Sequence, residues 1–240
     1  VDSIVYAPLS LPSIASSEIL CELERIDATK WFWDSYRQVK MLAIHTEKGG
    51  ASKHSVQNTG NPKLIEWTEI GLQLPRLRSY LSDVVFPLLD CKARVMILLT
   101  PSGQRIAEHI DCNLYGLNKR QHKIRVVLQG EESSLYFLSG SNLKDSKKVS
   151  PVCPKAGTPF VIDGSWPHGM INHSRETKLT LCIGAPWSGQ GNDIYLKHLE
   201  ESLDKYPQYI LTRKNLERPK DSALLIRQEQ VRPEILRQET

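Results

Sequence analysis

The sequence has few cysteines and no apolar run long enough to cross a membrane. Its five cysteines are odd in number and form no Cys-x-x-Cys pair, which argues against a disulfide framework or a zinc ribbon. A transmembrane helix needs about 20 consecutive apolar residues, and no stretch approaches that length. We therefore expect a cytoplasmic protein without a membrane span.

Excess charge is also scarce, and what there is lies in one region. The chain carries 31 Lys and Arg against 27 Asp and Glu. Residues 119–155 hold eight basic residues against three acids, an excess that covers the whole net charge of +4. Few aromatic side chains interleave with these cations, so we expect no nucleic-acid partner but a small-molecule or peptide substrate. The basic stretches KRQHK and NLKDSKK would favour an acidic substrate, although solvated loop charge is the commoner explanation.

The chain length fits one structural domain in three parts. Residues 1–90 are predicted to be a helical layer, with one helix starting near Ser16 and another over 74–89. Residues 91–187 are predicted to form the core. Residues 188–240 are predicted to be a helical extension whose prolines limit helix length.

Five short segments rich in Val, Ile, Leu and Thr predict antiparallel strands in the core. They are 92–100, 123–129, 134–138, 158–163 and 177–183, separated by clusters of Gly, Pro, Ser and Asn. Short strands between helical parts predict a mainly β fold with flanking helices. The expected core is a double-stranded β-helix, the jelly-roll architecture of cupin-like proteins.

A candidate metal site begins with the triplet His109-Ile-Asp111, which follows strand 92–100 and a turn. On a strand, residues i and i+2 point to the same side, so both side chains could bind one ion. The triplet alone is a weak signal, but His168 follows at the end of a later strand-like run. Two histidines and one carboxylate with open positions suit non-haem Fe(II), which can bind O2.

Cations fall on the polar faces of two predicted strands. Lys123 and Arg125 share one face of 123–129, and Lys178 begins the polar face of 177–183. If the apolar faces pack under helices, these cations line the interior, where burial is costly without an anion. The alternative is that the polar faces contact water. A dicarboxylate such as 2-oxoglutarate would chelate iron at one end and would need a cation at the other. Arg125 or Lys178, the latter on a hairpin expected to return to the sheet of His168, could supply it.

These residues resemble a known family. The run GTPFVIDGSWPHGMINHSRETKLTLCIGAPW is similar to the closing motif of the aspartyl/asparaginyl beta-hydroxylases, which are Fe(II)/2-oxoglutarate-dependent dioxygenases. In that motif an acidic turn, a metal histidine, an asparagine and a basic residue correspond here to Asp163, His168, Asn172 and Lys178. Two departures are that Lys178 replaces the usual arginine and that Arg125 stands where a histidine is common.

The resulting hypothesis is an oxygenase that uses Fe(II), 2-oxoglutarate and O2. His109, Asp111 and His168 would bind the metal, Arg125 and Lys178 the cosubstrate, and no further catalytic residue is predicted. His173 is a weaker rival to His168. The residue ten positions after His173 is Ile183, which cannot supply the cation that Lys178 supplies ten positions after His168. Trp166, beside His168, either contacts the substrate or only packs. The alternative function is a cupin-like protein that binds a metal or small anion without redox turnover.

Overall fold

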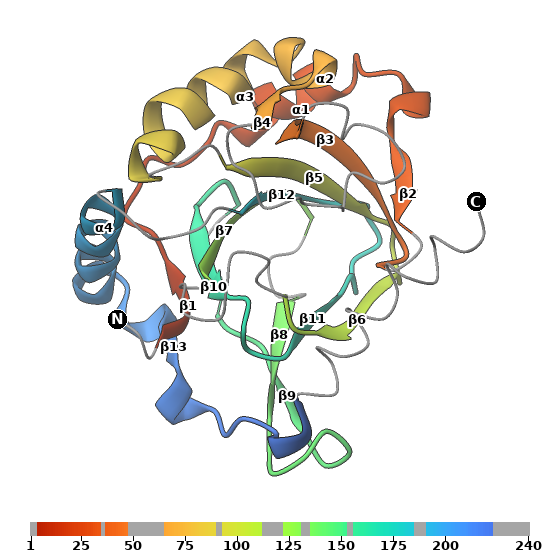
Figure 1. Ribbon diagram of the computed structural model, residues 1–240. Coiled ribbons are helices and arrows are strands. Elements are labelled where there is room, and N and C mark those ends of the chain that lie inside the picture. The colour runs from red at the N-terminus through yellow and green to blue at the C-terminus, as the bar shows by residue number, and fades with distance from the viewer. Residues whose placement is uncertain are drawn as a thin grey trace.

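The computed structural model describes residues 4–34, 37–47, 65–89, 93–111, 122–130, 135–152, 156–184 and 191–222. In these ranges two antiparallel sheets face each other, and helices lie against the larger one (Figure 1). Residues 48–64, residues 185–187 at the end of the predicted core, and residues 188–190 and 223–240 of the predicted helical extension lie outside the described residues. No helix of the described part is long and apolar enough to cross a membrane.

The core strands alternate between the two sheets, except that β8 and β9 both join the smaller one. Their bounds are β5 (Arg94–Thr100), β6 (Arg105–His109), β7 (His122–Gln129), β8 (Leu135–Ser139), β9 (Lys147–Val149), β10 (Phe160–Asp163), β11 (His168–Ile171) and β12 (Lys178–Gly184). The larger sheet contains the order β10-β7-β12-β5, and the smaller sheet has the order β6-β11-β8-β9. This winding defines a double-stranded β-helix, so the predicted fold class is confirmed.

Residues 1–90 differ from the expected helical layer because they also add strands to the larger sheet. These strands are β1 (Ile4–Pro8), β2 (Phe32–Asp34), β3 (Val39–Glu47) and β4 (Ile65–Trp67), and β13 (Leu211–Thr212) adds one from the other end of the chain. In β3, Val39 and Met41 pack on one side of the sheet while Leu42 and Ile44 pack on the other. Apolar residues on both faces give no clear strand alternation, which explains why the sequence pattern missed this strand.

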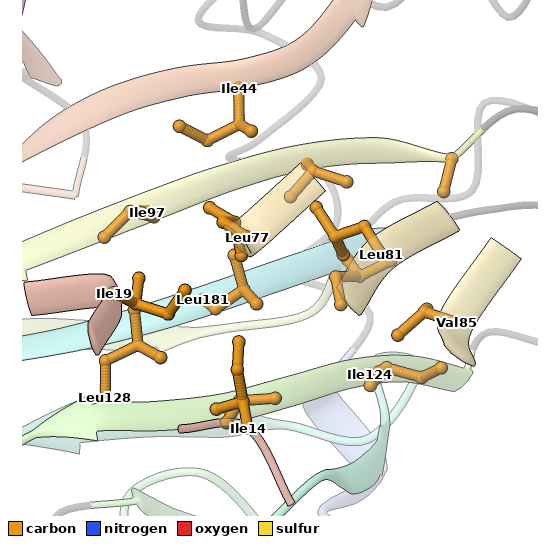
Figure 2. Packing of buried hydrophobic residues seen from close by; sticks show 14 of the residues in the cluster. Ile14, Ile19, Ile44, Leu77, Leu81, Val85, Ile97, Ile124, Leu128 and Leu181 are labelled. Atoms are coloured by element: carbon orange, nitrogen blue, oxygen red, sulfur yellow. The ribbon is translucent and has the colours of Figure 1, made fainter. Parts of the chain in front are cut away.

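The predicted amino-terminal helices are present and cover the outer face of the larger sheet. They are α1 (Ser16–Leu23) and α3 (Pro75–Tyr80), which continues as a π turn over Leu81–Val85 and a 3-10 turn over Phe86–Leu88. The short helix α2 (Glu69–Leu72), which precedes α3, was not predicted. A further helix, α4 (Gly191–Lys205), packs beside β1. Figure 2 shows Leu77 and Leu81 packed over the sheet residues Ile97 and Leu181.

The other face of the same strands lines the space between the sheets. Ile124 and Val126 of β7 belong to the core under the helices, whereas Val127 packs with side chains of the interior. Cys182 of β12 also lies in the interior and pairs in register with Arg125 of β7. The polar side of β7 and β12 therefore faces inward, and this side carries the charged residues of the candidate site.

Candidate metal centre

Strand pairing brings the two predicted histidines together. His109 ends β6 and lies opposite His168, the first residue of the neighbouring β11, with ring centroids 4.5 Å apart. Asp111 follows β6 by two residues, and its N–H donates to the carbonyl of Gly164 at 2.8 Å. All three side chains are buried, and their donor atoms lie within 4.8 Å of one another.

Backbone carbonyls orient both imidazoles. Nδ1 of His109 lies 2.8 Å from the carbonyl of Ala107, and Nδ1 of His168 lies 2.8 Å from the carbonyl of Trp166. Each Nδ1 is therefore the protonated donor, which leaves the lone pair of Nε2 as an available ligand. The two Nε2 atoms lie 3.7 Å from Asp111, that of His109 from Oδ1 and that of His168 from Oδ2.

Electrostatics hold these groups in the protonation states that metal ligands need. Burial, reinforced by His168, lowers the pKa of His109 to about 3, and burial also lowers the pKa of His168. For Asp111, burial raises the pKa, but Lys123 and the two histidines outweigh it and hold the pKa well below its ordinary value. At neutral pH the centre thus presents two neutral imidazoles and a carboxylate, and no proton has to leave when a metal binds.

The donor set fits a divalent transition metal. Nε2 of His168 is buried and has no hydrogen-bond partner among the described residues. Such an orphaned acceptor is costly unless something binds it. Ligands about 2.1 Å from one ion lie at most about 4.2 Å apart, which the two 3.7 Å distances satisfy. Three protein donors would leave positions open on a six-coordinate ion, as the facial triad of non-haem iron requires.

Two cations from β7 contact the carboxylate of the centre. Nζ of Lys123 lies 2.7 Å from Oδ2 of Asp111, and the guanidinium of Arg125 lies 3.8 Å from the same oxygen. The sequence placed both residues on one face of the strand but assigned only Arg125 to the site. Lys123 was missed because its partner lies on a different segment, which strand alternation does not reveal.

Lys178 is the first residue of β12, before the part of the strand that pairs with Arg125, and it is buried in the interior. It pairs in register with Thr100 of β5, and Thr180 is the next residue of its face. The hydroxyls of Thr100 and Thr180 are buried without a hydrogen-bond partner among the described residues. A buried cation beside two hydroxyls that can donate is an arrangement that suits a carboxylate. The sequence gave no reason to select the two threonines.

The connection between His168 and Lys178 is not the expected hairpin. His168 lies on β11 of the smaller sheet, and Lys178 lies on β12 of the larger sheet. Asn172 fixes the crossing, because its side-chain amide donates to the carbonyls of Thr100 at 3.0 Å and Glu176 at 2.7 Å. The expectation that both residues share a sheet was wrong, since strand propensity does not determine which sheet a strand joins. They nonetheless contribute to one interior.

Trp166 is buried, and its indole N–H donates to the carbonyl of Leu138 at 3.0 Å. Its ring packs with Val127, Phe137 and other interior side chains. These contacts account for the residue by packing, and any contact with a substrate would have to use the ring rather than the N–H. His173, the rival metal ligand, is exposed, so it takes no part in the buried cluster.

The fold and the site together define a class: double-stranded β-helix proteins with a two-histidine, one-carboxylate centre. No family model and no curated protein matches the sequence. A Pseudomonas putida prolyl-4-hydroxylase is similar in structure, with 17% identity and a TM-score of 0.42 over 76% of this chain and 93% of that chain. A Trichoplax adhaerens prolyl hydroxylase, in complex with a fragment of the hypoxia inducible factor, has 14% identity and a TM-score of 0.44, covering 76% and 83%. A Burkholderia pseudomallei oxidoreductase of the 2OG-Fe(II) oxygenase family has 10% identity and a TM-score of 0.45, covering 72% and 80%.

Proposed function

We propose that this protein is an Fe(II)- and 2-oxoglutarate-dependent oxygenase. It hydroxylates an unactivated C–H bond of an amino acid, a peptidyl residue or a small metabolite, and releases succinate and CO2. The observation that carries this proposal is the pairing of two features in one β-helix interior. One feature is the buried cluster of His109, Asp111 and His168. The other is the buried cation Lys178, at the start of β12, the strand that pairs with Arg125 of β7.

His109, Asp111 and His168 bind the metal. Iron held by these three ligands supplies the activation of O2, coupled to oxidative decarboxylation of 2-oxoglutarate. The neutral imidazoles and the ionised carboxylate donate electron pairs without releasing protons at neutral pH. The carbonyls of Ala107 and Trp166 keep each ring in one tautomer and one orientation.

Lys178 binds the far carboxylate of 2-oxoglutarate, with the hydroxyls of Thr100 and Thr180 donating to the same oxygens. Arg125 is less suited to this task, because it contacts Asp111 and so lies next to the metal ligands. A cation at the far end and a chelating metal at the near end fix the length and direction of a dicarboxylate. Burial of Lys178 and the two threonines strengthens the charge interaction by excluding water.

The finer assignment, to the aspartyl/asparaginyl beta-hydroxylases, rests on Asp163, His168, Asn172 and Lys178. In this chain Asp163 accepts hydrogen bonds from Ser165, and Asn172 fixes the crossing between the sheets. Asp163 and Asn172 therefore stabilise the local structure, which would explain why the closing motif contains them. We take a free or peptidyl amino acid as the first class of substrate to test.

Succinate release tests the function. Protein supplied with Fe(II), 2-oxoglutarate and ascorbate is expected to form succinate, and a screen of amino acids, peptides and acidic metabolites by mass spectrometry should find a product heavier by one oxygen atom. Asp111→Ala and His168→Ala should lose the activity. His198→Ala should keep it, because His198 pairs with Glu201 away from the cluster.

The alternative, a cupin-like protein that binds metal without turnover, makes a different prediction. It retains Fe(II) but does not bind 2-oxoglutarate to that metal. Anaerobic titration of the Fe(II) protein with 2-oxoglutarate therefore separates the two: a new visible absorption band indicates chelation, and an unchanged spectrum contradicts the oxygenase.

A further inference from the structure

Among the described residues, Lys123 has the shortest ion pair with a candidate metal ligand. Its ammonium lies 2.7 Å from Oδ2 of Asp111, and it reaches this oxygen from the strand β7. The side chain of Asp111 is 3% exposed and that of Lys123 is 29% exposed. A short ion pair of this kind restricts how a buried carboxylate can turn.

The two oxygens of Asp111 have different surroundings. Oδ1 lies 3.7 Å from Nε2 of His109 and has no cation against it in the described contacts. Oδ2 lies 3.7 Å from Nε2 of His168, and it has Nζ of Lys123 at 2.7 Å and the guanidinium of Arg125 at 3.8 Å. Oδ2 accepts no hydrogen bond of good geometry among the described residues, so its contact with Lys123 is an ion pair and the two oxygens differ by charge. Distance to the histidines alone would allow either oxygen to bind a metal, whereas both cations select Oδ2 as the oxygen that does not. A cation bound to one carboxylate oxygen repels a metal ion from it.

From this asymmetry we infer that Lys123 is a positioning residue that keeps Asp111 a monodentate ligand, through Oδ1. The inference rests on the proposed function, because it matters for the number of open positions. A six-coordinate ion with three monodentate protein ligands has three positions left, two for 2-oxoglutarate and one for O2. A bidentate Asp111 would fill one of them. Lys123 therefore preserves the position that the third ligand needs.

The test counts water molecules on a bound probe ion. Mn(II)-loaded wild-type protein should retain about three exchangeable waters by water-proton relaxation, and Lys123→Met should retain about two, because the freed Oδ2 joins the metal. Affinity for 2-oxoglutarate should fall at least about tenfold in Lys123→Met. Affinity for Mn(II) should not fall, since the variant removes a repelling charge. Lys123→Arg, which keeps a cation, should restore the wild-type water count.

A matched control is Lys148→Met, because Lys148 also pairs with a carboxylate, at 3.2 Å from Glu108, but away from the cluster. It should change neither the water count nor the affinities. If Lys123→Met does not fold, Lys123→Gln gives the same neutral test.

Equal water counts in wild type and variant overturn the inference, as does a parallel loss of Mn(II) and 2-oxoglutarate affinity, which a purely structural role would produce. Absence of 2-oxoglutarate binding to the wild type would instead contradict the proposed function, and the water count would still decide the role of Lys123.

Discussion

At the scale of single residues, the site consists of charges that would be unfavourable alone and are stabilised by specific partners. Asp111 is buried but contacts Lys123, and Asp163 is buried but contacts Arg213 at 2.7 Å. Lys178 is buried beside two hydroxyls that have no partner among the described residues. The first two arrangements are ion pairs within the chain. In the third, the two hydroxyls lie beside the cation and could donate to an anionic ligand that binds there.

Replacement of Lys178 by Met should raise the Kd for 2-oxoglutarate about 100-fold, because a bond between charged groups contributes about 1.5–3 kcal/mol. Metal affinity should stay unchanged, because Lys178 is at the start of β12 and does not belong to the metal cluster. The part of β12 near that cluster is Cys182, which pairs with Arg125. Lys178→Arg should retain most of the affinity. Anaerobic titration of the Fe(II) protein measures both constants, and a loss of metal affinity in Lys178→Met would contradict the assignment.

Asp163 predicts a pH dependence of stability. Burial raises the pKa of its carboxyl, but hydrogen bonds from Ser165 and Arg213 outweigh burial and hold the pKa below its ordinary value. The unfolded chain therefore takes up the proton first as the pH falls. The stabilisation is present above about pH 4 and is lost as the pH drops toward the folded pKa. Arg213→Gln raises that folded pKa, so it should lower stability at pH 7 and make the acid loss less steep.

Denaturant unfolding across pH 2.5–7 checks this expectation, where the range is chosen to bracket about pH 4, the ordinary pKa of an aspartate. Arg175→Gln is the control, because Arg175 is exposed and makes no ion pair in the described contacts. A parallel displacement of the Arg213→Gln and wild-type curves at every pH would show that Arg213 stabilises the fold without acting on Asp163.

The sequence revealed the part of the site that depends on local spacing. His109 and Asp111 are two residues apart at a strand end, so residue type and parity were enough to nominate them. His168 was nominated by residue type and by its place at the end of a strand-like run, whereas in the structure it is the first residue of β11. The roles of Lys123, Thr100 and Thr180 depend on which strands become neighbours. Lysine and threonine are common on polar strand faces, and no spacing within one segment marks them out.

At the scale of secondary-structure elements, the sequence predicted the strands that have one polar and one apolar face, such as β7 and β12. It missed β3, which is apolar on both faces, and β9, which is short and carries Lys147 and Lys148. It also could not assign β11 and β12 to different sheets. Strand propensity reflects only the residues of one segment, whereas the sheet that a strand joins depends on which other strands pair with it.

The short helix α2 depends on its N-cap residue, Thr68. The hydroxyl of Thr68 accepts from the N–H of Gly71 at 3.0 Å and donates to the carbonyl of Ala43 in β3 at 2.8 Å. Thr68→Ala removes this cap and the link to the sheet, so it should lower the free energy of unfolding by about 1–2 kcal/mol. Thr68→Ser keeps the hydroxyl and should lose much less. Chemical denaturation distinguishes them, and equal losses would mean that the methyl group matters more than the cap.

At the scale of the whole molecule, the larger sheet separates stability from chemistry. Its outer face carries the apolar core with α1 and α3 (Figure 2), and its inner face carries the charged groups of the candidate site. The buried cations and orphaned acceptors would weaken a core, but here the helical side of the sheet provides the apolar burial. Ligands that bind at the inner face should therefore contribute much of its share of the free energy of unfolding.

This separation predicts that a bound metal stabilises the entire fold. A ligand that binds only the folded chain adds about 2.7 kcal/mol at 100 times its Kd, which corresponds to a rise in Tm of about 5–10 °C for a chain of this size. Thermal unfolding with and without Mn(II) or Zn(II) should show this rise in the wild type, and a chelator should reverse it. His168→Ala should lose the rise because it removes one ligand of the cluster, whereas His198→Ala should keep it. An equal rise in His168→Ala would place the stabilising metal outside the His109–Asp111–His168 cluster, because a site that has lost one of its three donors binds too weakly to hold the fold at the same concentration.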